Sequence, residues 1–188
     1  MVYRYRNQDI SGIDKMTTAD LKAHWLSTGI AEGRPSSVVL DIKYYKENNS
    51  DLSSMTNTAA YNHFVNNGYK ESRTFSPTYM NWYYCDYNSD VNSDVGVAGC
   101  LKHYIEHGIK EDRGASSKFN ANYYWHLRPD VERTWPGDYE MCMMYYASVG
   151  INDNVVSVDK TGPVITDVKI TKVSTLGYTV SCIVTDNW

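Results

Sequence analysis

One pattern of apolar and polar positions recurs along most of this 188-residue chain. Each copy has a histidine followed by an apolar residue, a glycine five positions after the histidine, and a Glu-x-Arg triplet beyond that glycine. The pattern starts at His24, His63 and His103, and a degenerate copy starts at Tyr145. Self-similarity at a period of about 40 residues is typical of stacked supersecondary units, so the chain is predicted to be a tandem repeat.

Polar residues around this pattern mark the two ends of a helix in each copy. A residue favoured at a helix N-cap lies seven positions before each start, at Thr17, Thr56, Gly96 and Asp138. The glycine five positions after each start is expected to close the helix in the left-handed conformation. These closing glycines are Gly29, Gly68, Gly108 and Gly150.

A second phrase lies upstream and predicts a first, shorter helix in each copy. A Tyr-Tyr pair is followed by an Asp seven positions after its first Tyr. Asp41, Asn81 and Asn120 are placed to start these helices, and Pro129 prevents the last one from continuing. Each copy is therefore predicted to be a helical hairpin. The tyrosine pairs occupy residues 44–45, 83–84 and 123–124.

These phrases divide the chain into a helical repeat domain and a β segment. After the last copy, residues 157–162 are typical of a linker, and β-branched alternation predicts strands at 164–170 and 178–184 around a turn at 174–177. A lone hairpin buries too little to be stable, so residues 163–188 are expected to be an incomplete β-sandwich. The predicted fold class is mainly α: four tandem helical hairpins, the first truncated, and a short C-terminal β-hairpin. The predicted copies span residues 1–35, 36–74, 75–114 and 115–156.

Composition and charge argue against nucleic-acid binding and membrane insertion. The net charge of −4 argues against a nucleic-acid-binding face, which needs a basic patch. No stretch of about 18 apolar residues occurs, so no membrane insertion is expected in this segment. Tyrosine is the outlier, since 17 Tyr and 5 Trp stand against 3 Phe. Such rings carry a polar atom and suit thin helical layers or binding interfaces. No motif implies a cofactor.

The four cysteines do not predict a zinc site, because the chain has no Cys-x-x-Cys pair. Cys100 and Cys142 occupy the motif position that Leu21 and Ala60 hold in the earlier copies. A position that accepts these residue types is interpreted as a packed core position with free thiols. A disulfide between Cys85 and Cys100 is the alternative.

The recurring histidines are the most tempting candidates for chemistry. A catalytic group has no reason to recur in register, so His24, His63 and His103 are interpreted as structural. We expect each to be half-buried and to bond a backbone carbonyl or an acidic side chain. No nucleophile elbow, zinc motif or paired carboxylates stand out, so a hydrolase is the least favoured class and no catalytic residue is predicted.

The recurring arginines Arg34, Arg73 and Arg113 follow just past each closing glycine. Arginine presents a planar fork of donors that suits carboxylates and the exposed carbonyls of a helix end. We predict that these arginines, with the glutamate two positions before each, pin every repeat to the next. Binding of a glycan or carboxylate is the alternative. The candidate partners are Asp51, Asp90 and Asp130.

Residues 88–94 alternate oxygen-bearing side chains, which raises the question of calcium. They lack the glycine and distal glutamate of an EF-hand loop, and calcium needs six to eight oxygen ligands. No metal site is predicted.

Aromatic residues that do not recur in register are the best candidates for a ligand surface, because binding hot spots favour Trp and Tyr. They concentrate in the third and fourth copies. The alternative is that several of them fill gaps between layers. The candidate ligand-binding residues are Tyr69, Trp82, Tyr87, Trp125, Trp135 and Tyr139.

Taken together, the two phrases over about residues 2–156 resemble a tandem helical repeat of large bacterial extracellular proteins. Its form is roughly F-D-x-x-Y-Y, then N-P-D-V, then H-Y-L-x-x-G-x-x-E-G-R. The tail from Gly162 to Asp186 is similar to the opening of the Bsp-like repeat of Gram-positive bacteria, an immunoglobulin-like module of cell-surface proteins. These resemblances imply a secreted or cell-wall-associated parent protein, often with a separate catalytic or anchoring domain.

The sequence therefore favours a non-enzymatic binding module of a bacterial surface or secreted protein that recognises a protein or glycoprotein partner. On the resemblance alone, host immunoglobulin is one candidate partner. The alternatives are a carbohydrate or cell-wall binding module, with sugars stacked on Trp82, Trp125 or Trp135, and a structural spacer within a larger secreted enzyme. One shared groove would favour the glycan, and a flat patch would favour the protein.

Overall fold

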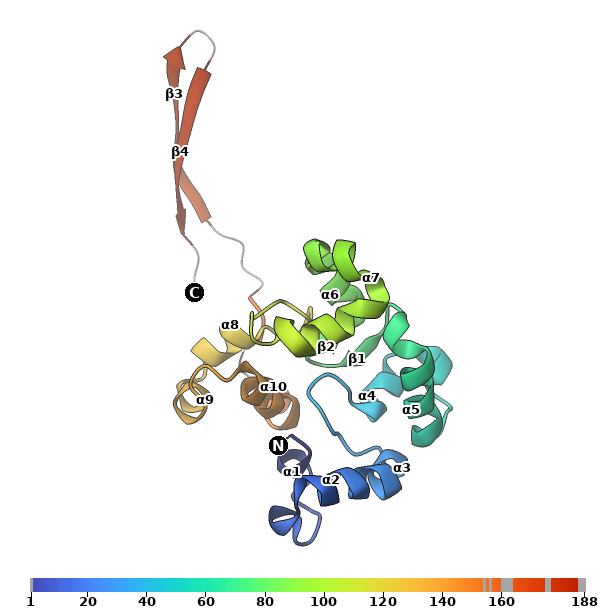
Figure 1. The fold of residues 1–188 in the computed structure, drawn as a ribbon. Coiled ribbons are helices and arrows are strands. Elements are labelled where there is room, and N and C mark those ends of the chain that lie inside the picture. Colours follow the sequence, from blue (N-terminus) through green and yellow to red (C-terminus); the bar gives the residue numbers. More distant parts are fainter. Residues whose placement is uncertain (1, 154, 156, 160–163, 175–176, 186–188) are drawn as a thin grey trace. The chain divides into compact units, whose positions relative to one another are not determined.

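The structure is a computed structural model that describes residues 2–153, 155, 157–159, 164–174 and 177–185. The chain forms two compact units, Met1–Val158 and Asp159–Trp188. The first unit is mainly helical and the second is an antiparallel pair of strands (Figure 1). The mainly helical class and the C-terminal strand pair predicted from the sequence are thereby confirmed.

The first unit consists of short helices joined by single 3-10 or π turns. Its first half contains α1 (Val2–Arg6), η1 (Ile13–Lys15), α2 (Thr18–His24), η2 (Trp25–Gly29), α3 (Ile30–Glu32), α4 (Ile42–Glu47), η3 (Ser50–Leu52), α5 (Asn57–Asn66), η4 (Gly68–Lys70) and β1 (Thr74–Ser76). Its second half contains β2 (Tyr79–Met80), α6 (Asn81–Tyr87), α7 (Ser89–His103), η5 (Tyr104–Gly108), α8 (Ala121–His126), α9 (Pro129–Thr134), α10 (Tyr139–Ser148) and η6 (Gly150–Asn152).

Helix starts follow the capping chemistry of the sequence. Thr17 forms a capping box at the start of α2, and the side chains of Thr56 and Asp138 accept hydrogen bonds at the starts of α5 and α10. Asp41 and Asn120 cap α4 and α8 in the same way. Five of the seven predicted N-caps are therefore confirmed.

The third copy departs from this scheme at two positions. Gly96 interrupts α7 with a φ of 64° and a ψ of 174°, so it separates two helical stretches without a side-chain cap. Asn81 was expected to cap a helix but is its first residue, and Met80 is the N-cap. The buried Asn81 amide instead accepts a hydrogen bond from the Tyr79 hydroxyl at 2.7 Å and donates one to the Glu71 carbonyl at 3.0 Å.

A hydrogen bond between tyrosine and histidine joins the two helices of the first three copies. The hydroxyl of the second tyrosine of each pair, or of Tyr3 in the first copy, lies against histidine Nδ1. The sequence predicted a backbone carbonyl or an acidic side chain as the histidine partner, and that prediction was wrong. The histidines are half-buried, as expected. The oxygen–nitrogen distances are 2.8 Å for Tyr3 and His24, 3.0 Å for Tyr45 and His63, and 2.8 Å for Tyr84 and His103.

The same hydroxyls explain the recurring glycines. Gly29 has a helical φ of −60°, and none of Gly29, Gly68, Gly108 and Gly150 is left-handed, so their predicted role as left-handed caps was wrong. A Cβ on Gly29 would lie 2.7 Å from the Tyr3 hydroxyl oxygen, and the other three glycines have equally close tyrosine hydroxyls. Close approach of the tyrosine, not backbone conformation, excludes a side chain at these positions.

The segments that link successive copies bond to one another by their backbones. We call residues 35–41, 74–80 and 114–120 the linking segments. Asp41 N donates to the Phe75 carbonyl at 3.1 Å, and Met80 N donates to the Ala115 carbonyl at 2.8 Å. Asn120 N donates likewise to the carbonyl of Ser157 at 2.8 Å. The linking segments thus contribute backbone hydrogen bonds between successive copies.

Serine hydroxyls add a second set of bonds between these segments. Ser76 Oγ donates to the Val38 carbonyl at 2.9 Å, and Ser116 Oγ donates to the Pro77 carbonyl at 2.7 Å. Both serines are buried, so these bonds satisfy polar groups that water does not reach.

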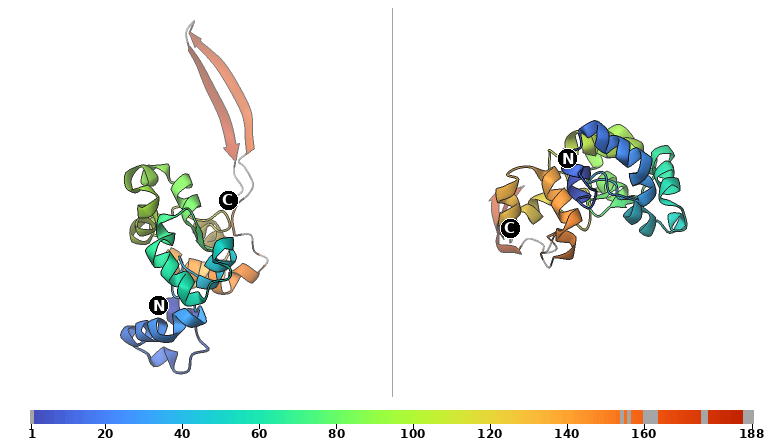
Figure 2. Two further views of the ribbon diagram at one scale, coloured as in Figure 1. Left: turned by 90° about the vertical axis from the view of Figure 1, so that its right-hand side faces the viewer. Right: turned by 90° about the horizontal axis from the view of Figure 1, so that it is seen from below.

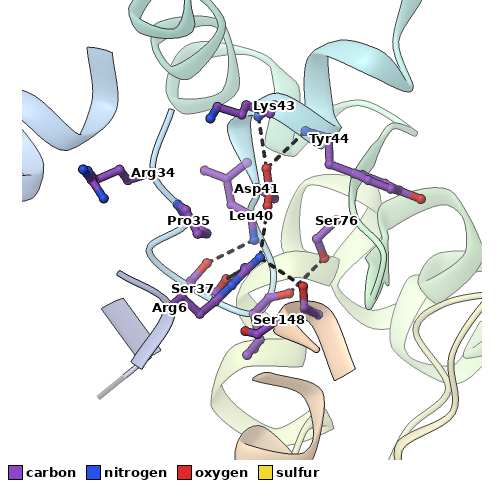
Figure 3. A network of polar contacts seen from close by, with 12 residues as sticks. Arg6, Arg34, Pro35, Ser37, Leu40, Asp41, Lys43, Tyr44, Ser76 and Ser148 are labelled. Carbon is purple, nitrogen blue, oxygen red and sulfur yellow. Dashed lines mark hydrogen bonds and ion pairs between the residues drawn. The ribbon is translucent and has the colours of Figure 1, made fainter. Parts of the chain in front are cut away.

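A buried arginine joins the beginning of the first unit to its last helix (Figure 3). Arg6 bonds the Asp41 carboxylate at 3.2 Å and the carbonyls of Ser37 and Ala147 at 3.4 and 3.3 Å. Burial lowers the pKa of Arg6, and the Asp41 carboxylate opposes that shift. Helix α1 therefore lies beside α10, as both views in Figure 2 show. In an open solenoid each copy would touch only its neighbours, whereas here the first copy contacts the fourth.

Cys85, Cys100 and Cys142 are buried free thiols, as predicted for Cys100 and Cys142. Cys85 and Cys100 are both free, so the alternative of a disulfide between them was wrong. Burial raises the pKa of Cys142 to about 12. Cys182, in the second unit, is exposed.

The second unit pairs β3 (Val164–Ser174) with β4 (Gly177–Thr185) in antiparallel register. Ile165 lies opposite Val184, and the register shifts between Thr166 and Lys169, where Asp167 has a φ of 51°. This irregularity interrupts the strict alternation predicted for the strand. The predicted turn at residues 174–177 falls partly outside the described residues. Residues 160–162 of the predicted linker lie outside them entirely.

Substitution of Gly68 by Ala is expected to lower the free energy of unfolding by about 1–3 kcal/mol, because its Cβ would overlap the Tyr45 hydroxyl. In a Tyr45→Phe background that hydroxyl is absent, and the same substitution should cost less. Urea unfolding of the four proteins measures the coupling. Additive effects would show that the hydroxyl does not exclude the side chain.

Substitution of Arg6 by Met is expected to destabilise the first unit by about 3 kcal/mol, because it leaves a largely buried Asp41 carboxylate without its partner. The matched control is Arg133→Met, since Arg133 is exposed on α9. Equal urea midpoints for the two variants would mean that the Arg6 contacts contribute no net stability.

Candidate binding surface

The recurring arginines bind carboxylates of their own copy. Arg73 Nη1 and Nη2 lie 2.8 and 2.9 Å from the two oxygens of Asp51, and its Nε bonds Glu71. The hairpin brings the end of the second helix back to the Asp that follows the first, so the clasp closes within a copy. The predicted partners Asp51 and Asp90 are therefore confirmed, whereas the predicted placement of the clasp between repeats was wrong. The other two arginines share this arrangement, Arg34 with Asp9 and Glu32, and Arg113 with Asp90 and Glu111.

In each clasp the positive charge of the arginine is paired with the negative charges of its two carboxylates. The hydrogen bonds from arginine lower the pKa of Asp9, Asp51 and Asp90. Burial raises the pKa of the neighbouring Tyr45 to about 12. The carboxylates are therefore ionised and the phenol is neutral at pH 7, an arrangement that orders the hairpin.

The fourth copy obtains its arginine from a different position. Val155 stands where the other copies have the clasp arginine, and Arg128 takes over from the opposite side of the hairpin. Arg128 bonds Asp130 at 2.8 and 2.9 Å, the Tyr145 hydroxyl at 2.7 Å, and the Asp153 carboxylate. Asp130 was predicted to pair with one of the recurring arginines, which was wrong. The sequence could have indicated this change, because the fourth copy lacks the arginine at position 155 and has one at position 128 instead.

The non-recurring aromatic residues form separate groups. Trp125 packs with Tyr139 at a centroid distance of 6.0 Å and with His126 at 5.3 Å. Trp135 packs with Tyr5 at 6.1 Å and with Tyr145 at 5.9 Å, so it joins the first and fourth copies. Each of these indoles is half-buried. These contacts match the alternative that some of the candidates fill gaps between layers.

Tyr69 and Trp125 are two candidate ligand-binding residues that are only partly exposed. Tyr69 is half-buried and lies under the Lys70 ammonium, 5.1 Å from it. The Trp125 indole N–H is buried and has no hydrogen-bond partner among the described residues.

The most exposed candidates lie together on α6. We call Trp82, Tyr83 and Tyr87 the α6 patch. Trp82 is 39% exposed and Tyr87 is 67% exposed. The rings of Tyr83 and Tyr87 stack at 5.1 Å with an interplanar angle of 12°, and Trp82 meets Tyr83 edge-on at 5.6 Å. The Trp82 indole N–H donates to Thr74 Oγ1 at 3.3 Å, which fixes the ring.

The oxygen-bearing run at residues 88–94 makes protein contacts in the structure. Asp90 is held by Arg113, and the amide of Asn88 donates to the Gly114 carbonyl at 2.9 Å. No group of three or more His, Cys, Asp and Glu side chains among the described residues is placed to hold a metal ion. None of the described helices is long and apolar enough to span a bilayer.

No protein-family model, curated protein or solved structure matches this chain. The resemblance to bacterial extracellular repeats and to the Bsp-like repeat therefore stays a prediction.

Substitution of Asp130 by Asn tests the relocated clasp through its pH dependence. The hydrogen bonds from Arg128 lower the pKa of Asp130 to about 2 from an ordinary 3.8. The carboxylate thus stabilises the folded state fully above pH 3.8, and that contribution disappears as the pH falls through 2. Because its side chain is 56% exposed, solvent screening limits the contribution to below about 1 kcal/mol.

Urea unfolding of wild type and Asp130→Asn at a series of pH values measures this difference. The difference in the free energy of unfolding between the two proteins should be largest near neutral pH and should shrink in acid. The exposed Asp94→Asn variant is the control. A difference between wild type and Asp130→Asn that is as large at pH 2 as at pH 7 would contradict the assignment.

Proposed function

We propose that this chain is a non-enzymatic binding module of a bacterial cell-surface or secreted protein, and that it recognises a protein or glycoprotein partner through the α6 patch. The observation that carries the proposal is the exposure of Trp82 and Tyr87 beside a stacked Tyr83. Trp and Tyr dominate binding hot spots because they bury a large area at low conformational entropy cost. These rings already pack against each other, so ordering them on binding costs little.

A protein partner is favoured over a glycan by the placement of the three candidate indoles. A sugar-binding groove would need Trp82, Trp125 and Trp135 to share a surface, whereas each packs with its own aromatic neighbours. Within the α6 patch, Tyr83 and Tyr87 cover one face of each other, which leaves less open ring for a sugar.

The proposal includes the organisation of the chain. We take the first unit to be four copies of one helical hairpin, and β3 with β4 to belong to an immunoglobulin-like fold. The recurring Tyr–His and Arg–Asp contacts support the first statement. The recurring residues then form the scaffold, and Trp82 and Tyr87 of the α6 patch lie outside their shared pattern.

Binding to purified host immunoglobulin, measured by biolayer interferometry, tests the proposal together with a glycan array. We expect saturable binding to the protein ligand and at least a tenfold weaker affinity for Trp82→Ala and Tyr87→Ala. Leu26→Ala is the matched control, because Leu26 is 53% exposed on η2. Glycan binding that depends on Trp82 would establish the carbohydrate alternative, and binding to neither probe would favour a spacer.

A further inference from the structure

The third copy carries a second histidine about one helical turn after its motif histidine. His107 follows His103 at the i+4 position, and the centroids of the two rings lie 5.3 Å apart. Residues four positions apart lie on the same face of a helix, so both imidazoles project from one side of the turn that joins α7 to η5. His107 is exposed and His103 is half-buried. The pair is therefore accessible to an ion from solvent.

This pair of histidines occurs in one copy and not in the others. The position of His107 is held by Thr28 in the first copy, Asn67 in the second and Val149 in the fourth. The first copy even forms the same π turn, η2, with Thr28 at this position. A histidine that the other copies replace without losing the hairpin is not needed for packing.

We propose that His103 and His107 together bind a divalent transition-metal ion such as Zn²⁺ at an open site on the surface of the first unit. Imidazole nitrogen is a preferred ligand of Zn²⁺, Ni²⁺ and Cu²⁺. Zn–N bonds of about 2.0–2.1 Å at a tetrahedral angle place two ring centroids about 5 Å apart. The observed 5.3 Å fits that spacing. The remaining positions on the ion are open to water or to a group from another molecule.

Tyr84 orients the ring of His103 for this role. Its hydroxyl lies 2.8 Å from Nδ1 of His103, so Nε2 is the nitrogen left for the ion. In the metal-bound form Nδ1 carries the ring proton and donates to the Tyr84 oxygen, which leaves the Nε2 lone pair for the ion. Metal-binding histidines almost always have such a partner on their other nitrogen, because it fixes both the tautomer and the direction of the ring.

A neighbouring carboxylate offsets part of the positive charge of the ion. Glu111 interacts electrostatically with both His103 and His107. It is bound to Arg113 Nε at 2.6 Å, so it acts as a nearby charge and not as a third ligand. The charge of Arg113 is itself paired with Asp90 as well. The site thus has two protein ligands, in agreement with the lack of a three-ligand group among the described residues.

The test titrates Zn²⁺ into the chain and follows the imidazole signals of His103 and His107 by NMR. Every protein carries Cys182→Ser, because the exposed Cys182 thiol is another zinc ligand. We expect saturable shifts of both rings, and at least a tenfold weaker affinity for His107→Thr, which copies the residue of the first copy. Mg²⁺, which prefers oxygen ligands, should cause no saturable shift. Equal Zn²⁺ affinity in His107→Thr, or no saturable shift of these two rings, would overturn the proposal.

A gain of binding in the first copy keeps the test independent of any loss of folding. His24 meets the Tyr3 hydroxyl at 2.8 Å, and Thr28 is exposed in the π turn η2. Thr28→His should therefore raise the Zn²⁺ stoichiometry from one ion per chain to two. Leu26→His is the control and should add no ion, because residues two positions apart do not face each other on a helix. An unchanged stoichiometry in Thr28→His would contradict the geometric argument. The α6 patch plays no part in this test, so its outcome is separate from that of the proposed function.

Discussion

The contact on which the helical unit depends is the hydroxyl of a buried tyrosine wedged between a histidine and a glycine. In the first three copies the phenol of the first helix reaches histidine Nδ1 on the second, at 2.8–3.0 Å. The glycine must lack a side chain because the phenol occupies the space of its Cβ. One polar bond inside an otherwise apolar layer thus sets how close the two helices approach, and a buried hydroxyl without that bond would be costly.

Around this contact, separate sets of polar groups carry different parts of the fold. Arginine clasps such as Arg73 with Asp51 hold each hairpin to itself, and the backbones of the linking segments hold one copy to the next. Arg6 then joins α1 to Asp41 and to the end of α10. Because the linking segments bond in sequence and Arg6 joins the two ends, the copies contact beyond nearest neighbours.

The residues that recur in each copy hold the fold together, and the exposed aromatic residues are mostly ones that do not recur. The recurring tyrosines, histidines and arginines are bound to one another, which leaves little of their polar chemistry available to a ligand. The available apolar surface lies where the pattern is broken, at the exposed rings of Trp82 and Tyr87 on α6. A repeated chain can acquire binding sites in this way without disturbing the contacts that all copies share.

Local chemistry was readable from the sequence, and the identity of long-range partners was not. The period, the mainly helical class, the C-terminal strand pair and N-caps such as Thr17 and Asp41 follow from short-range patterns, because a cap bonds residues two or three positions away. The partner of His63 and the reason for Gly68 were misjudged, since each depends on a tyrosine 18 or 23 positions distant in the same hairpin. Asp51 was a predicted partner of the arginines, but the sequence did not show that Arg73 reaches it within one hairpin. The Arg6 contact with Ala147 spans 141 positions. A periodic sequence shows that such positions matter in every copy, but the hydrogen bonds between them are set only when the helices pack.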